Sequence, residues 1–149
     1  MNNKIFIVYF CFIIGFENET LIYNLSFRGW SAGESSLSIK KDTITDIEVY
    51  NLISTTKTNS LLDKIYKIRN KINLILDAND LSIKKIEKKI NERGKKKLFK
   101  SIINYDSLLA TSNNKTIKIP GKVLDPFGSI YYLRKREINL LDTFRFNTY

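Results

Sequence analysis

Apolar and polar residues alternate over several short segments of this 149-residue chain, and this period-two pattern is the strongest constraint on its fold. The clearest alternating segments are Leu21–Arg28, Glu34–Lys40, Ile47–Thr58 and Leu98–Tyr105. Stretches rich in glycine or polar residues, such as 29–33 and 93–97, separate the segments and can turn the chain, the first as a wide turn. We therefore expect an α+β, mostly β fold with a curved antiparallel sheet and one or two short helices.

Two segments carry the start signals of short helices. Ser60–Asp63 matches a capping box, and the apolar residues between Leu61 and Ile68 follow at helical spacing. Asp125 and Pro126 are typical of the N-cap and the first position of a second helix. The expected buried face of this second helix consists of Phe127, Ile130 and Leu133.

The segment Leu81–Asn91 fits either a helix or a strand. Ile83, Ile86 and Ile90 lie at helical spacing, and periodicity alone therefore favours a helix that ends near Gly94. As a strand, the segment would place lysine and isoleucine side chains on the same face. That face would then be only partly apolar, so the residues fit a strand less well than a helix. Weaker alternation predicts further strands at 71–76, 108–112, 116–119 and 143–149.

The N-terminus resembles a signal for export. Lys4 precedes an uncharged run from Ile5 to Phe16, which is shorter than the roughly 20 apolar residues that span a bilayer. This length is typical of the apolar core of a secretory signal peptide. We expect residues 1–18 to be a signal peptide and residues 19–149 to form a single β-rich exported domain. The alternative is a buried strand or an uncleaved anchor.

The composition excludes several kinds of catalysis. The chain has no histidine and a single cysteine, Cys11, so imidazole-based catalysis and an intrachain disulfide are excluded. Two pairs of nearby carboxylates, Asp42 with Asp46 and Asp77 with Asp80, occur in a loop and a turn, where aspartate commonly bonds to the local backbone. We expect a protein that is not an enzyme and has neither a cofactor nor a metal site.

The basic residues are concentrated in the second part of the chain. The net charge is +10, and the stretch 84–100 is strongly basic. Such a charge attracts phosphates, anionic lipids or acidic proteins. An exported protein does not meet genomic DNA, so we expect no nucleic acid partner. We predict contact with an anionic membrane surface through Arg93, Lys95, Lys96 and Lys97; the alternatives are a solvated sheet edge and a lysine-rich genome composition.

Two stretches resemble a known family. The first comprises Glu19-Thr-Leu-Ile-Tyr23 and Gly29-Trp-Ser-Ala-Gly33-Glu34, and the second is Asp125–Arg134. Together they are similar to the family called domain of unknown function 3108, which consists of bacterial exported proteins. The positions that match the family motif are Tyr23, Gly33, Asp125, Pro126 and Arg134.

The resemblance implies a fold and a location. Members of the family are expected to form an open half-barrel, similar to periplasmic lipoprotein carriers, with a strand, a turn and a strand over residues 81–106. On this ground we expect strands rather than a helix at 81–92 and 96–105. The family continues for several strands after the position where this chain ends, which implies a fragment without the C-terminal strands. The implied location is periplasmic, or associated with the outer membrane, in a Gram-negative bacterium.

Two main hypotheses for the function remain. In the first, the concave face of the sheet binds a lipid, an acyl chain or a lipidated protein, and Trp30, Tyr131 and Tyr132 lie at the rim of the pocket. In the second, the protein is a structural or protein-interaction component of the cell envelope without a small-molecule ligand. The bland alternative for the three aromatic residues is that they cover or fill the core.

Overall fold

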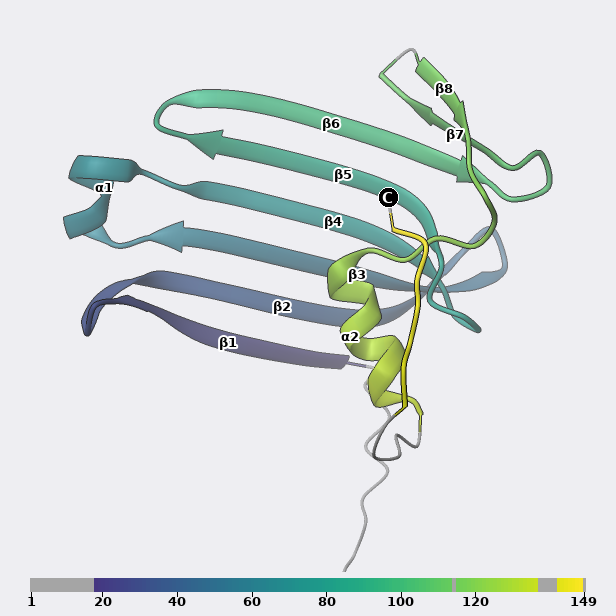
Figure 1. The fold of residues 1–149 in the computed structure, drawn as a ribbon, viewed down its shortest axis with the longest axis horizontal. Coiled ribbons are helices and arrows are strands. Elements are labelled where there is room, and N and C mark those ends of the chain that lie inside the picture. Colours follow the sequence, from purple (N-terminus) through teal and green to yellow (C-terminus); the bar gives the residue numbers. More distant parts are fainter. Residues whose placement is uncertain (1–17, 114, 137–141, 149) are drawn as a thin grey trace, which may run out of the picture.

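A computed structural model describes residues 18–113, 115–136 and 142–148. In these residues, eight antiparallel strands form one open sheet in sequence order, together with two short helices (Figure 1). The elements are β1 (Asn18–Phe27), β2 (Trp30–Ile44), β3 (Ile47–Thr58), α1 (Ser60–Tyr66), β4 (Arg69–Asp77), β5 (Ile83–Glu92), β6 (Lys95–Asn104), β7 (Leu109–Ser112), β8 (Lys115–Lys118) and α2 (Pro126–Arg134). The mostly β fold predicted from the alternation is confirmed. The predicted signal peptide lies outside the described residues except for Asn18, which begins β1.

Two-residue turns join β1 to β2, β2 to β3 and β5 to β6. Phe27 pairs directly with Trp30, so the turn consists of Arg28 and Gly29 alone, and the wide turn expected over 29–33 is wrong. Both turn residues have positive φ, 50° and 83°, and Arg93 and Gly94 repeat this geometry with 51° and 78°. A two-residue turn with this geometry matches the right-handed twist of the paired strands. Two residues are therefore enough to connect the strands of each hairpin.

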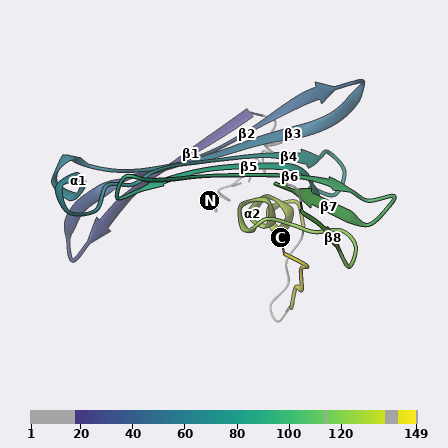
Figure 2. The same cartoon turned by 90° about the horizontal axis from the view of Figure 1, so that it is seen from above.

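The core lies between one face of the sheet and α2. Ile39, Leu52, Leu74 and Ile86 are paired across β2 to β5, and all four are buried. Figure 2 shows α2 on one face of the curved sheet only. The alternation seen in the sequence therefore places one apolar row against the helix, and the other row faces away from it.

The start of α2 is as predicted, but its buried face is as predicted only in part. The Asp125 carboxylate accepts a hydrogen bond from the backbone N–H of Phe127, and Pro126 occupies the first turn. The buried residues of α2 are Gly128 and Tyr131, and the predicted Phe127 packs partly buried against the core, whereas Ile130 is 40% exposed. Gly128 lies over Leu76 of β4, where an added Cβ would meet the Leu76 side chain at 3.5 Å, an ordinary contact; α2 therefore faces the sheet with Gly128 and Tyr131.

Two other local predictions need correction. Asn59 caps α1, because its side-chain oxygen accepts from the backbone N–H of Leu62; the predicted cap, Ser60, is already helical. The C-terminal residues 142–148 form no strand of the sheet. They run past the loop before α2, where the backbone N–H of Leu124 donates to the carbonyl of Asn147 and only Thr148 forms an isolated bridge.

The strand that the family resemblance implied over 81–92 is confirmed from Ile83 to Glu92, and the helix favoured by periodicity alone is wrong. The register between β4 and β5 shifts by one residue between Ile75 and Leu76. This irregularity pairs Ile83 with Leu76 and Ile86 with Leu74, so both isoleucines face the core although they are three residues apart.

Candidate functional site

The face of the sheet that packs on α2 is only partly covered. In Figure 1, α2 crosses the strands near one end, and the strands continue beyond it toward α1. The register places apolar residues of β1, β4, β5 and β6 on this uncovered part of the same face, and none of them is fully buried. We call this surface the open face and define it by Tyr23, Leu25, Ile72, Ile90 and Phe99.

A cationic hollow adjoins the open face. Its volume is about 560 Å³, and it is lined by Tyr66, Ile90, Glu92, Arg93, Lys95 and Lys97. The guanidinium carbon of Arg93 lies 5.4 Å from the centre of the Tyr66 ring, which is a cation–π distance. The structure thus brings together three of the four basic residues predicted to contact an anionic surface. Lys96 is adjacent in the chain but points to the opposite face, because residues alternate along β6.

The charge of the hollow is largely uncompensated. The acidic residue in its lining is Glu92, whose Oε1 accepts a hydrogen bond from the side-chain nitrogen of Asn70 at 2.7 Å. Among the described residues, none of the nine ion pairs involves Arg93, Lys95, Lys96 or Lys97. The hollow therefore presents three cationic groups against one carboxylate, an arrangement suited to an anionic group.

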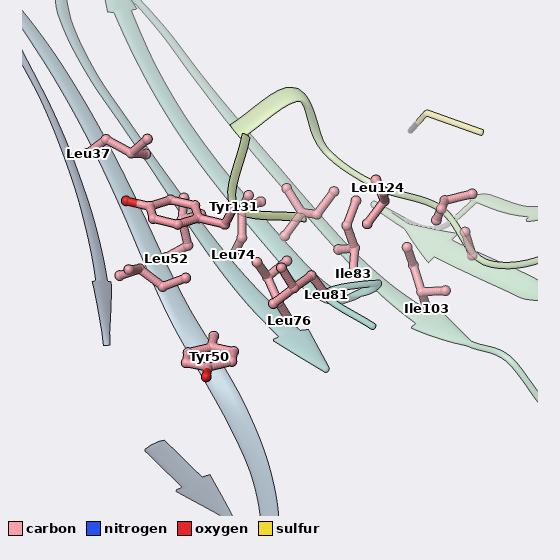
Figure 3. Packing of buried hydrophobic residues seen from close by; sticks show 14 of the residues in the cluster. Leu37, Tyr50, Leu52, Leu74, Leu76, Leu81, Ile83, Ile103, Leu124 and Tyr131 are labelled. Carbon is pink, nitrogen blue, oxygen red and sulfur yellow. The ribbon is translucent and has the colours of Figure 1, made fainter. Parts of the chain in front are cut away.

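The three aromatic residues predicted to form a pocket rim lie in three different environments. Trp30 is 76% exposed and lines an apolar hollow of about 350 Å³ with Leu61 and Ile65. Tyr132 packs edge-on against Phe146 at 5.4 Å, near the loop that precedes α2. Tyr131 is fully buried among Leu37, Leu52 and Leu74, as Figure 3 shows. Tyr131 is therefore a core residue and no part of a rim.

Burial dominates the chemistry of Tyr131. It raises the pKa of the phenol to about 12, and the nearby Glu19 carboxylate acts in the same direction. The phenol therefore stays neutral throughout the physiological pH range. This state suits a residue that holds α2 against the sheet.

An ion pair connects the two stretches that carry the family resemblance. The guanidinium of Arg134 donates to both carboxylate oxygens of Glu19, with distances of 2.6 and 3.1 Å. The hydrogen bond to Glu19 raises the pKa of Arg134 above its ordinary value. The pair ties the end of α2 to β1, the strand at one edge of the sheet. Sequence reasoning missed this contact, although both residues belong to the stretches that resemble the family.

The other motif positions also have structural roles. A Cβ atom on Gly33 would lie 2.2 Å from the carbonyl oxygen of Lys57 on the paired strand, so only glycine fits there. Asp125 is 2% exposed, caps α2, and lies 3.7 Å from the ammonium of Lys88. Tyr23 lies on the open face and is 46% exposed, so it is the motif position that is accessible to a ligand there.

The carboxylates near the β4–β5 connection are engaged in local contacts. Burial opposes ionisation of Asp77, but hydrogen bonds from the Lys84 ammonium and the backbone N–H of Asn79 outweigh it and hold its pKa below the ordinary value. Burial likewise opposes the ionisation of Asp80, and contacts with Ser82 and Lys122 lower its pKa. Both residues therefore help to order the turn.

The described residues contain no group of three or more cysteine, aspartate or glutamate side chains placed to hold a metal ion. In the same residues, no helix has the length and apolar character required to cross a membrane.

These features define the class: a curved, antiparallel open-sheet domain with a helix over one half of a face and a cationic hollow beside the other half. The chain belongs to the family described as Protein of unknown function (DUF3108), whose model matches residues 22–149. The match confirms the resemblance seen in the two motif stretches. Comparison with curated proteins and with solved structures finds no match.

Proposed function

We propose that this protein is a non-catalytic, exported domain whose open face binds an acyl chain, either of a lipid or of a lipidated protein. The observation that carries the proposal is the continuity of the open face with the cationic hollow. Ile90 belongs to both surfaces, so an apolar chain and an anionic group on one molecule can be bound side by side. The proposed location is the periplasm or the outer membrane of a Gram-negative bacterium. Nucleic acid and metal ions are not among the proposed partners.

The chemistry of the two surfaces supports a ligand with two parts. Half-buried side chains such as Ile72 and Phe99 already pack against the core and expose the rest of their apolar surface on the open face. An acyl chain that covers this surface gains about 25 cal/mol for each Å² removed from water. Lys95 and Lys97 lie on the same face of β6 as Phe99, within reach of a carboxylate or phosphate at the end of the chain.

A matched pair of substitutions tests the proposal. Ile90→Asn places a polar group on the open face, and Ile53→Asn makes the same change at a half-buried position on the opposite face of β3. We expect Ile90→Asn to weaken binding of a fluorescently labelled palmitate about 10-fold, a change worth about 1.4 kcal/mol. Ile53→Asn should bind as the unchanged protein does. Thermal unfolding of both variants controls for loss of the fold.

Equal affinity of the two asparagine variants for the labelled palmitate would contradict the proposal. Mass spectrometry of lipids extracted from the purified protein provides an independent measurement. We expect a bound lipid with an acidic headgroup or a free fatty acid, in an amount close to one molecule per chain.

One observation favours the second candidate function, a structural or protein-interaction component of the envelope. In the described part of the chain, β1 pairs with β2 along one side only, and the backbone groups on its other side form an edge of ten residues. Such an edge is a template for strand addition by another protein. A purified protein that contains no lipid but gains strand content with an added partner peptide would favour this function over acyl binding.

A further inference from the structure

Three elements meet at the end of the sheet that lies away from α2: the β1–β2 turn, α1 and the β5–β6 turn (Figure 1). This end exposes large apolar side chains: Trp30 is 76% exposed, Leu61 63% and Ile65 78%. The three residues line one hollow, to which Arg28 also contributes. We call these three side chains the apolar cap.

The helix in this region presents its apolar side chains to solvent. A surface helix normally packs its apolar face on the core, but α1 has no buried residue. Polar contacts hold it instead: the Asp63 carboxylate accepts from both terminal nitrogens of Arg69, at 2.9 and 2.5 Å, and from the Thr58 hydroxyl. The hydrogen bonds from Arg69 and Thr58 keep the pKa of Asp63 below its ordinary value, so these contacts persist at neutral pH. The polar side of α1 is thereby fixed to the sheet, and Leu61 and Ile65 face away from it.

Basic residues flank the apolar cap. Lys64 and Lys67 are exposed at the end of α1. Tyr66, which follows Ile65 in the chain, lines the cationic hollow together with Arg93, Lys95 and Lys97. The β5–β6 turn adds Lys96 on its other face. Indole and aliphatic side chains with lysine and arginine beside them are typical of protein segments that lie in the headgroup region of a bilayer.

We propose that the α1 end of the sheet docks onto the surface of an anionic bilayer. The apolar cap enters the boundary between headgroups and acyl chains, while Arg93 and Lys95–Lys97 contact the anionic headgroups. The charge of this end favours a membrane over a neutral apolar partner, because the basic residues that flank the cap would be left desolvated and unpaired at a dry protein interface. The proposal does not depend on acyl binding at the open face.

The sequence supplies a probe of this docking. Trp30 is the sole tryptophan of the chain, so its fluorescence reports on the apolar cap alone. With vesicles of phosphatidylcholine that contain one-third phosphatidylglycerol, we expect the emission to shift to shorter wavelength. Brominated acyl chains should quench it. Vesicles that bind the protein but leave the Trp30 emission unchanged would overturn the proposal.

Two sets of substitutions separate the contributions of charge and of apolar contact. The charge variant replaces Lys95, Lys96 and Lys97 with Gln; its matched control replaces Lys40, Lys115 and Lys118, which are exposed elsewhere, with Gln. At low salt the charge variant should co-sediment with the vesicles at least about 10-fold more weakly than its control. The difference should shrink as salt rises. All variants keep the same N-terminal segment, so a difference between them reports on the site that was changed.

The apolar variant carries Leu61→Ser and Ile65→Ser, and its control carries Ile44→Ser and Ile47→Ser at an exposed hairpin at the other end of the sheet. We expect the apolar variant to bind about 10-fold more weakly than its control at every salt concentration. Because none of these four side chains is buried, the fold should remain intact, which circular dichroism checks. If the charge variant or the apolar variant binds the vesicles as strongly as its own control, the α1 end is not the docking site.

Discussion

Replacing Tyr131 with alanine is expected to lower the free energy of unfolding by about 3–5 kcal/mol. Tyr131 has no exposed surface and is the largest fully buried side chain among the described residues. Its ring fills the space between α2 and the strands at Leu37, Leu52 and Leu74 (Figure 3). An alanine leaves a cavity that a nine-residue helix and a sheet cannot close without moving apart.

Urea denaturation, followed by circular dichroism, measures this loss. Tyr131→Phe keeps the ring and should cost far less than Tyr131→Ala, and Ile130→Ala, on the exposed side of the same helix, should stay within about 0.5 kcal/mol of the unchanged protein. Equal destabilisation by Ile130→Ala and Tyr131→Ala would show that α2 packs on the sheet through a different face. Faster amide exchange in α2 of the Tyr131→Ala variant would show that the helix has undocked.

The strands follow from the sequence because alternation and turn residues agree there. The segment Ile47–Thr58 was predicted with the bounds of β3 itself, and Arg93-Gly94 supplies the positive φ that a two-residue turn requires. Periodicity alone predicted a helix for the segment 81–92, and this was wrong because the register shift beside Leu76 places Ile83 and Ile86 of a strand on one face. A three-residue spacing, which normally indicates a helix, is thus produced by a strand with one extra residue.

The buried face of α2 was missed in part, for a different reason. A ranking of side chains by apolar character selects Phe127, Ile130 and Leu133 and gives no weight to Gly128; of these three, Phe127 packs against the core. In the structure Gly128 and Tyr131, three residues apart, face the sheet on the same side of the helix, and the Tyr131 side chain enters the core. Sequence reasoning placed Tyr131 at a rim because Tyr131 and Tyr132 precede the basic residues 134–136, which could contact a headgroup. The structure shows the alternative, a buried tyrosine.

The candidate site was predicted in part. The basic residues of the β5–β6 turn were identified because they are consecutive in the chain. The contact of Trp30 with the same hollow as Leu61 and Ile65 was not predicted, since these residues come from the start of β2 and from α1, about 30 positions apart. In an antiparallel sheet with its strands in sequence order, every second connection lies at the same end, so the β1–β2 turn and α1 lie together. Predicting this contact therefore requires the order of the strands.

Gly33→Ala is expected to lower the free energy of unfolding by about 2–3 kcal/mol. In an ordinary strand this change is favourable, because alanine loses less backbone entropy on folding than glycine does. Here the added Cβ would lie 2.2 Å from the carbonyl oxygen of Lys57 and 2.9 Å from the Cα atom of Thr58. Both contacts are with backbone, which cannot rotate away as a side chain can, so β2 and β3 must separate where they pair.

Gly128→Ala is the matched control for this prediction. Its new Cβ would meet the side chain of Leu76 at 3.5 Å, an ordinary contact, and alanine favours a helix over glycine by up to about 1 kcal/mol. We therefore expect urea midpoints to fall for Gly33→Ala and to stay equal or rise for Gly128→Ala. The loss at Gly33 should extend to the nearby hydrogen bond from the Asn59 backbone N–H to the Ala32 carbonyl, which tethers the start of α1. A Gly33→Ala variant as stable as the unchanged protein would mean that β2 and β3 lie further apart than the structure shows.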